Sequence, residues 1–588
     1  MPAADHEEAS NRLGKSPRKS HRRRARFARR RAGLIGAVVA VAVLVAGIIV
    51  ATGAGHDVGS GQRGATAARS VDLSSAASEQ KSSQSRAART SLGPDGVESS
   101  VVIAENKLPG TNAWRINPRH RKYIEGFAST TDAVRGDQVS LYVSTPARTF
   151  EVIAYRMGWY QGKGAREVWR SAPILAKIQP PCPVTSPVNM VSCDNWSPSA
   201  IVRITPAFVP GDYLLKLVGS GAQQSYVLLT VSQPSSRAAY LVIARSMTEE
   251  GWNTFGGYDF YLGEGPCTFG TTTAAYPTCN RSRIVSFDRP YAESNGAEDF
   301  LTEELPLVEF AEQHGLDVTY TTDVAVSEQP SLLLGHRAIL SLAHDETWTY
   351  AELSGVQTAI GKGENVAFFS AAAIVRHARL QASPLGRSRE VVDYRDADED
   401  PLNGKASQND VTGNTWASSP TDYSVTALVG ELYSGFLYPG KAAAFVVTDA
   451  SSWIFSGTGL RDGSKIPEVI ASDIDHLSPS SPMPSDLEVL GHSPVPISVA
   501  FTSDGEWDAE TYSDMTYYTD PKSEAGVFDS GTVNWITTLD ECPATDRACP
   551  ARLTSKITGN LLHLFGQGPA GRSKPSVANS QLVKPAGS

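Results

Sequence analysis

The residues best suited to chemistry are His344, Asp345 and Glu346, which stand next to one another in the chain. They follow an apolar run over 338–343 that predicts a buried strand, and they precede a segment with helical spacing. Ligands of open α/β sheets bind beyond the carboxyl ends of the strands. An imidazole and two carboxylates there can coordinate a metal ion or transfer protons. A structural role is also open, because Asp345 or Thr347 can cap the following helix and Glu346 suits its dipole.

The part of the chain that must position these residues, 235–567, alternates apolar strands with amphipathic helices. This alternation predicts an α/β domain with a parallel sheet. A closing helix is expected near 533–564. The other expected elements are strands at 239–244, 317–320, 337–343 and 364–370 and helices at 305–314 and 350–362.

Residues 97–234 show a different pattern, in which polar and apolar positions alternate in short runs broken by Gly, Pro and Asp. Period-two runs at this spacing predict an antiparallel β-sandwich of immunoglobulin type. No grouping of side chains for catalysis is found in this part. The clearest runs lie at 137–145, 149–155, 212–218 and 225–231.

The N-terminal region predicts a membrane anchor. Residues 1–32 form a basic tail with eleven Lys and Arg against three acidic residues, and 33–52 carry no charge. About 20 apolar residues span the hydrocarbon core, and the cations before them place the N-terminus in the cytoplasm. A cleaved signal peptide is the alternative, although its apolar region has only about 7–15 residues. We therefore expect a single-pass protein of the cell membrane with its bulk outside.

Two further segments show no apolar periodicity. Residues 53–96 are rich in Ala, Ser, Gly and Arg, and they predict a flexible linker between the membrane and the folded part. Residues 568–588 predict a disordered tail.

All six cysteines lie beyond the membrane segment, in three close pairs. An even number in local pairs predicts disulfides formed in an oxidising compartment. Zinc binding is the alternative, but none of the pairs has the C-x-x-C spacing of zinc sites. The expected disulfides are Cys182–Cys193, Cys267–Cys279 and Cys542–Cys549.

The charge of the body limits the class of partner. Beyond residue 32 the chain has 42 basic and 59 acidic residues. Nucleic-acid binding requires a basic face, so we expect no nucleic-acid partner. A small molecule or a cell-surface ligand remains.

Several motifs resemble, in the same order, those of proteins related to the large (β) subunit of N,N-dimethylformamidase. The resemblance covers roughly residues 108–565. It implies a glutamine-amidotransferase-like α/β domain behind the β-sandwich. The motifs are Met157-Gly-Trp-Tyr with Gly162 and Gly164-Ala-Arg, Ser286-Phe-Asp-Arg-Pro-Tyr, His344-Asp-Glu-x-Trp, Ala367-Phe-Phe-Ser, Phe455-Ser-Gly-Thr-Gly and Gly531-Thr-x-x-Trp.

The resemblance also implies a mononuclear iron site, with two Tyr phenolates and a Glu as ligands. Glu346 matches the ligand carboxylate, and His344 matches a histidine beside the iron. Tyr291 is the expected Tyr ligand, with Tyr261 as the alternative. Asp473 matches a second Glu near the metal, and it is one methylene shorter.

Two positions depart from this pattern. Trp252 stands where the other ligand Tyr is expected, and an indole nitrogen donates a hydrogen bond but cannot bind a cation. Ala372 replaces the Asn that the family has near the iron. Both changes remove groups from the implied iron site.

The resemblance therefore implies a hydrolase of C–N bonds other than peptide bonds, with His344, Glu346 and Asp473 as catalytic residues and an altered metal site. The alternative is a relative that binds a cell-surface ligand or partner without turnover. In either case we expect His344 and Glu346 to line a cleft at the strand ends, near Trp252 and Asp473.

Overall fold

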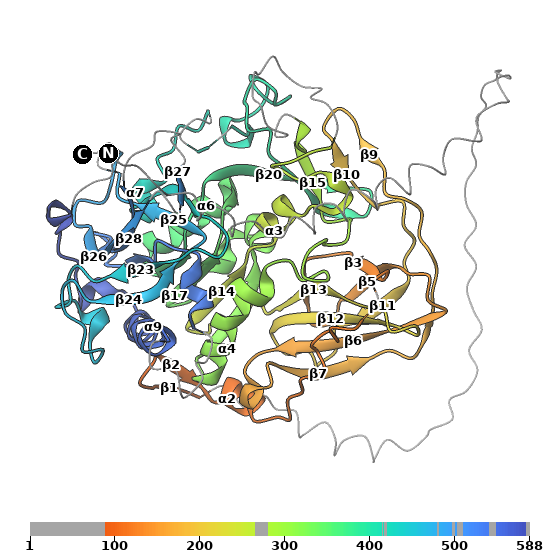
Figure 1. Ribbon diagram of the computed structural model, residues 1–588, viewed down its shortest axis with the longest axis horizontal. Helices are drawn as coiled ribbons and strands as arrows, with labels where there is room; N and C mark the ends of the chain where they lie inside the picture. The colour runs from red at the N-terminus through yellow and green to blue at the C-terminus, as the bar shows by residue number, and fades with distance from the viewer. Residues whose placement is uncertain are drawn as a thin grey trace, which may run out of the picture. The chain divides into compact units, whose positions relative to one another are not determined.

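The computed structural model describes residues 89–583, except 121, 265–279, 414, 417–419, 479–480, 497–499, 503–509 and 540–548. The predicted basic tail, membrane segment and most of the linker lie outside this part of the chain. Within the described residues, no helix is both long and apolar enough to cross a bilayer. The structure is mostly β-sheet with few helices (Figure 1).

Two sheets pack face to face in the first part of the chain. The first has the order β11 (Ala200–Arg203), β5 (Gln138–Ser144), β3 (Glu125–Ala128) and is antiparallel. The second has the order β4 (Asp132–Val134), β13 (Gln224–Ser232), β12 (Gly211–Gly219), β6 (Thr149–Met157), β7 (Ala165–Arg170), with β8 (Ile174–Leu175) beside β6. The inward side chains of both sheets form one core, in which Leu141, Val152 and Leu215 are fully buried.

A seven-stranded sheet organises the second part. Its order is β16 (Val318–Thr322), β14 (Tyr240–Ala244), β17 (Ala338–Ala343), β19 (Asn365–Ser370), β29 (Gly526–Asp529), β28 (Glu510–Thr519), β26 (Glu488–Pro496). The first five strands are parallel, and the last two are antiparallel to their neighbours.

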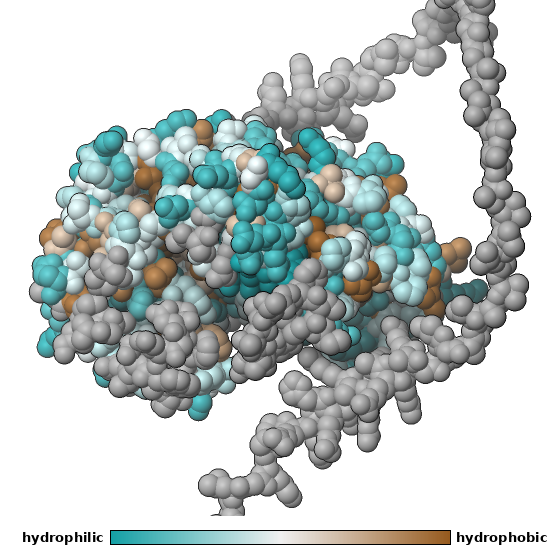
Figure 2. All heavy atoms as spheres, turned by 90° about the horizontal axis from the view of Figure 1, so that it is seen from above, coloured by the Kyte–Doolittle hydropathy of each residue, from teal (hydrophilic) through white to brown (hydrophobic). Residues whose placement is uncertain are grey.

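Helices cover both faces of this sheet, which explains why its central strands β14, β17 and β19 are mostly apolar. Leu340 and Phe369 share one core with α4 (Leu305–Gln313), α8 (Asn534–Thr537) and α9 (Ala551–Phe565). Ile339 and Phe368 share the opposite core with α5 (Asp323–Glu328) and α6 (Tyr350–Gly361). Apolar side chains are thereby withdrawn from the surface, and Figure 2 shows hydrophilic residues predominating on one face of the molecule.

Smaller elements surround the main sheet. Two helices, α3 (Ser246–Trp252) and α7 (Thr426–Val429), add to them. The remaining sheets are β15 (Ile284–Ser286), β21 (Gly386–Val392), β20 (Arg376–Ser383), β18 (Thr347–Thr349); β25 (Asp473–His476), β22 (Leu432–Leu437), β27 (Ala500–Thr502); β23 (Ala443–Val446) with β24 (Lys465–Ile470); and β9 (Val184–Thr185) with β10 (Met190–Val191).

The first described elements lie against the second part of the chain, although the sandwich was predicted to begin at residue 97. A hairpin of β1 (Thr90–Leu92) and β2 (Val97–Ser99) leads into α2 (Ser100–Asn106). The amide of Asp317 donates to the carbonyl of Val97 at 2.7 Å, and that of Ser99 donates to Gly315 at 2.8 Å. This hairpin therefore extends the α/β part.

Two predictions near the C-terminus were wrong. The closing helix expected over 533–564 is two helices, α8 and α9, on either side of the undescribed residues 540–548. The tail predicted to be disordered from 568 is ordered as far as Val583, because Asn579 is buried and exchanges hydrogen bonds with the backbone of Val489.

The disulfide Cys182–Cys193 is confirmed. Cys549 is also disulfide-bonded, and its predicted partner Cys542 lies outside the described residues. Cys267 and Cys279 lie outside them as well.

Candidate functional site

The strand order brings two loops together at one edge of the main sheet. After β14 the chain continues to β16 on one side, and after β17 it continues to β19 on the other side. The two loops therefore begin side by side on neighbouring strands and then run in opposite directions. Such a switch point is where open α/β sheets bind ligands. The loop after β14 forms α3, which ends at Trp252, and the loop after β17 carries His344 and Glu346.

Hydrogen bonds between these loops fix the backbone around Glu346. The hydroxyl of Thr248, in α3, accepts from the amides of Glu346 at 3.1 Å and Thr347 at 3.0 Å. Residues 347–349 form β18, and α6 is capped by Thr349, whose hydroxyl accepts from the amide of Glu352. The alternative in which Asp345 or Thr347 caps the helix is therefore wrong.

The carboxylate of Glu346 is the centre of the site. Its Oε2 accepts hydrogen bonds from the hydroxyl of Tyr261 and from the indole N–H of Trp252 at 3.1 Å. Its Oε1 accepts from Nε of Arg376 at 3.1 Å. His344 lies beside it, with 3.6 Å between Nε2 and Oε2. The sequence analysis expected Glu346, His344 and Trp252 to lie together, and the structure brings them together.

The charges around Glu346 keep it ionised. Burial alone would raise its pKa, but nearby His344, Arg376 and Arg395 and the hydrogen bond from Tyr261 lower it below the ordinary value. The pKa of Tyr261 is raised by burial and by the adjacent Glu346, so its phenol keeps its proton.

Tyr261 lies in a stack of three planar groups. The ring of Trp252 covers one face, with centroids 3.7 Å apart and 16° between the planes. The guanidinium carbon of Arg395 lies 4.0 Å from the Tyr261 centroid, and the space that Trp252 occupies leaves only the other face for it. Trp252 itself is 40% exposed.

Asp473, at the start of β25, completes the group. Burial raises its pKa and Glu346 raises it further, whereas His344, a hydrogen bond with Tyr433 and one with Ser472 oppose the shift. The charges of His344 and Glu346 therefore act on Asp473, and its pKa lies above the ordinary value.

Unusual backbone conformations surround these side chains. Ala343, immediately before His344, has φ 50°, and Ser472, immediately before Asp473, has φ 59°. Ala372 has φ 57°. Non-glycine residues rarely adopt this left-handed region, which costs about 1–2 kcal/mol each. Such conformations cluster at functional sites, which favours a functional role for this edge of the sheet.

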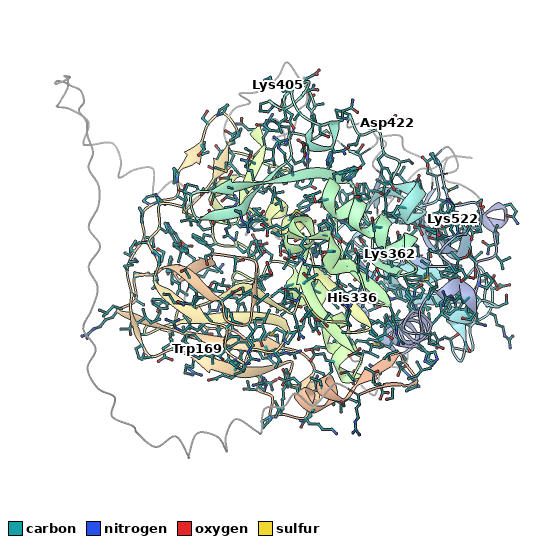
Figure 3. The ribbon with its side chains drawn as sticks, turned by 180° about the vertical axis from the view of Figure 1, so that it is seen from behind. Trp169, His336, Lys362, Lys405, Asp422 and Lys522 are labelled. Atoms are coloured by element: carbon teal, nitrogen blue, oxygen red, sulfur yellow. A yellow bond between two sulfur atoms is a disulfide. The ribbon has the colours of Figure 1, made fainter. Side chains whose placement is uncertain are left out.

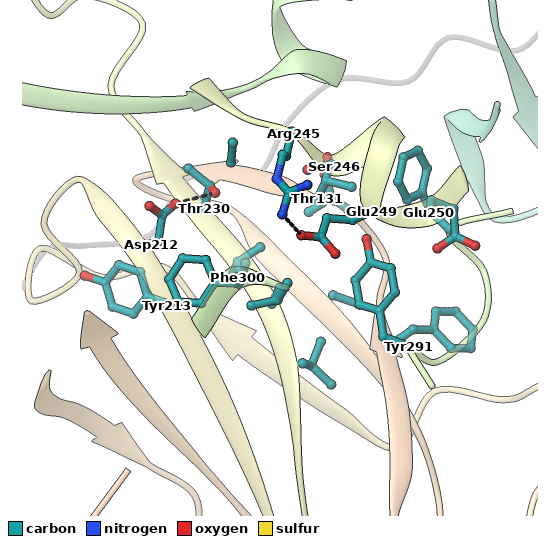
Figure 4. Close-up of a pocket in the computed structure, with 18 of the residues that line it drawn as sticks. Thr131, Asp212, Tyr213, Thr230, Arg245, Ser246, Glu249, Glu250, Tyr291 and Phe300 are labelled. Carbon is teal, nitrogen blue, oxygen red and sulfur yellow. Dashed lines mark hydrogen bonds and ion pairs between the residues drawn. The ribbon is translucent and has the colours of Figure 1, made fainter. Parts of the chain in front are cut away.

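Tyr291 lies in a different place. It lines a cavity of about 60 Å³ between the sandwich and the α/β part, and its hydroxyl points toward Glu249 (Figure 4). Among the described residues that line this cavity, neither His344 nor Glu346 is found. The tyrosine that meets Glu346 is thus Tyr261, which the sequence analysis gave as the alternative.

Arg245 connects that cavity to the site. It directly follows β14, and its NH1 donates to the backbone carbonyl of His344 at 3.3 Å. It is 2% exposed and forms ion pairs with Glu303 at 2.8 Å, Glu249 at 3.0 Å and Glu304 at 3.4 Å. Arg245 therefore holds the His344 loop against α3.

Four residues of the site were not predicted from the sequence: Arg376, Arg395, Tyr433 and Arg245. None of them belongs to a motif, and each is far in sequence from Glu346. A signal existed only for Arg245, which occupies the carboxyl end of a predicted strand.

The donor set does not fit the implied iron. Both oxygens of Glu346 already accept hydrogen bonds, one of them from the guanidinium of Arg376. Trp252 presents an N–H donor, and Tyr261 keeps its proton. Across the described residues, no three His, Cys, Asp or Glu side chains are arranged to hold a metal ion.

Comparison with known families agrees with these motifs. The family described as N,N-dimethylformamidase beta subunit-like, C-terminal, matches residues 151–549, which is more than half of the chain and includes every residue of the site. No curated protein matches the chain.

Proposed function

Because the chain belongs to the N,N-dimethylformamidase beta subunit-like family, we propose that it hydrolyses an amide that is not a peptide bond. His344, Glu346 and Asp473 are the catalytic residues of this proposal. The observation that carries it is a pair of carboxyls beside one histidine, with the pKa of Glu346 lowered and that of Asp473 raised. Opposite pKa shifts in one site give the two carboxyls different roles, with Glu346 as the ionised stabiliser and Asp473 as the acid.

In the proposed reaction His344 takes a proton from water as the oxygen attacks the amide carbon. Ionised Glu346, 3.6 Å from His344 Nε2, stabilises the imidazolium that forms. Arg376 and Arg395 favour the negative charge that develops on the carbonyl oxygen. Protonated Asp473 gives its proton to the nitrogen as the C–N bond breaks. The products are a carboxylic acid and an amine, and the proton on His344 returns to Asp473 through water.

We further propose that this reaction proceeds without the family's tightly bound iron. The support is the donor set, in which Trp252 and Arg376 direct N–H groups at Glu346. An arginine and an indole next to the carboxylate oppose a metal cation in the same place.

The proposal also includes the finer architecture and the location. We assign the second part to a glutamine-amidotransferase-like α/β fold and the first to an immunoglobulin-like sandwich. We place the protein in the cell membrane, anchored through 33–52, with its bulk outside. The Cys182–Cys193 disulfide supports an oxidising compartment. External protease on intact cells should digest the folded part, and its protection would contradict this topology.

A binding role without turnover is the second candidate. It is favoured by the same carboxylate, because hydrogen bonds from Tyr261, Trp252 and Arg376 engage both oxygens of Glu346. A carboxylate held in this way serves well as a rigid part of a binding surface.

The test is a panel of simple and N-substituted amides with the full-length protein in detergent, followed by release of amine. We expect turnover that is lost in Asp473→Asn and His344→Ala and kept in the control Asp398→Asn, which changes an exposed acid. Saturable binding of an amide without any release of amine would favour the binding role.

A further inference from the structure

The most exposed large side chain of the site is Trp252, which packs against Tyr261 on one face and has the tilted ring of His344 at 5.6 Å between centroids. Tyr261 packs against that face at 3.7 Å, and 40% of the Trp252 surface remains accessible. By comparison His344 is 13% and Arg376 16% exposed. An indole in this position offers a flat apolar surface next to partly accessible reactive groups.

The indole is held rigidly. Its N–H donates to Glu346, and Tyr261 behind it is supported in turn by Arg395. The hydrogen bond and the stacked ring restrict the rotamers of Trp252 before a ligand binds, and this lowers the entropic cost of binding. Because the indole N–H donates to Glu346, a ligand on the indole also lies next to the Glu346 carboxylate.

The size of this surface limits the substrate. A formamide or acetamide has too little apolar surface to cover an indole, so its binding would gain little free energy from the burial of apolar surface. A cationic ligand would also favour an aromatic face. It gains little charge attraction here, because Glu346 already pairs with Arg376 and Asp393 with Arg395. The remaining ligand has a flat C–H face and a polar, uncharged edge.

We propose that the amide is carried on a sugar ring, so that the substrate is an N-acylated amino sugar stacked on Trp252. This inference rests on the proposed function and names its substrate class. One face of a pyranose presents C–H groups that pack on an aromatic ring. Its hydroxyls at the edge pair with Asp473 and Arg376, and the N-acyl group projects toward His344.

Calorimetric binding of three probes to the full-length protein tests the proposal. The probes are N-acetylglucosamine, its β-1,4-linked trimer and N-methylacetamide, which keeps the amide and lacks the ring. We expect the sugars to bind at least about tenfold more tightly than N-methylacetamide. Trp252→Ala should weaken sugar binding by about tenfold, because it removes the stacking surface. Trp252→Phe should keep most of the affinity.

Trp169 provides the matched control. It is a partly buried tryptophan on β7 of the sandwich (Figure 3), and Trp169→Ala should leave sugar binding unchanged. Equal affinity for N-methylacetamide and the sugars, or sugar binding that survives Trp252→Ala in a folded protein, would overturn the inference. Release of amine is measured on the same samples. Trp252-dependent sugar binding without release would support this inference and contradict the proposed hydrolysis, whereas release that does not depend on Trp252 would do the reverse.

Discussion

Trp252 and Tyr261 lie stacked, with 3.7 Å between their ring centroids, and both donate a hydrogen bond to the same oxygen of Glu346. The family pattern led us to expect a ligand tyrosine at 252, where this chain has an indole. The indole N–H donates a hydrogen bond to this carboxylate. Glu346 is thereby satisfied by protein donors.

Trp252→Tyr should restore metal affinity. A phenolate can bind a cation and an indole N–H cannot, so the substitution adds a ligand beside Glu346 and opens space. We expect wild-type protein to carry well under one iron per chain, and the variant to carry clearly more, by elemental analysis after purification with Fe²⁺. Trp252→Phe removes the indole without adding a ligand and serves as the control. Stoichiometric iron in the wild-type protein would show that the donor set has been misjudged.

Arg245 should contribute strongly to stability. It is 2% exposed and pairs with Glu249 and Glu304, which are 4% and 3% exposed, so Arg245→Ala removes the cation from a buried group of carboxyls. Removing one partner of a buried pair costs about 3–5 kcal/mol. Arg170, which is 45% exposed in its pairs, is the control, and Arg170→Ala should cost at most about 1 kcal/mol. Urea denaturation measures both, and similar losses would contradict the buried network.

Strands and helices could be predicted from the sequence where the spacing of apolar residues stayed regular over the whole element. The strand 338–343 and the helix 350–362 were recognised because buried strands and amphipathic helices differ in period, and β17 and α6 confirm them. His344 and Glu346 followed from their place after that strand.

The rest of the site depends on contacts between distant segments. Arg376 begins β20 and Tyr433 lies in β22, both in small sheets without a motif, and only the folded chain brings them to Glu346 and Asp473. The separation of Tyr261 from Tyr291 could not be predicted for the same reason, since both follow β14 and no motif shows which of them reaches Glu346. The membrane segment at 33–52 stays a prediction.

Stability should fall as the pH rises from about 4 toward 8. Burial raises the pKa of Glu304 to about 8 and that of Asp475 to about 7, so the folded state holds protons that the unfolded chain has lost. The unfolding free energy therefore decreases by about 1.4 kcal/mol per pH unit for each such proton between the unfolded and folded pKa values. Glu304→Gln cannot titrate and should flatten this slope. Chemical denaturation between pH 5 and about 8 checks it, and an unchanged slope in the variant would contradict the assignment.

Ala372→Asn should increase hydrolysis of simple amides. The position has φ 57°, a conformation that Asn tolerates better than most residues, so the backbone favours the substitution. The backbone N–H of residue 372 already donates to Asp475 at 2.8 Å, and this bond can persist. The new amide would add a donor for the carbonyl oxygen, a group worth about 3 kcal/mol where it has been removed from other enzymes. An increase of roughly tenfold or more in turnover is expected. This is less than about 3 kcal/mol would give, because the neighbouring side chains do not orient the new amide. Ala372→Leu adds a similar volume without an amide and should lower turnover. Equal effects of the two substitutions, with melting temperatures unchanged, would show that residue 372 does not face the reacting carbonyl.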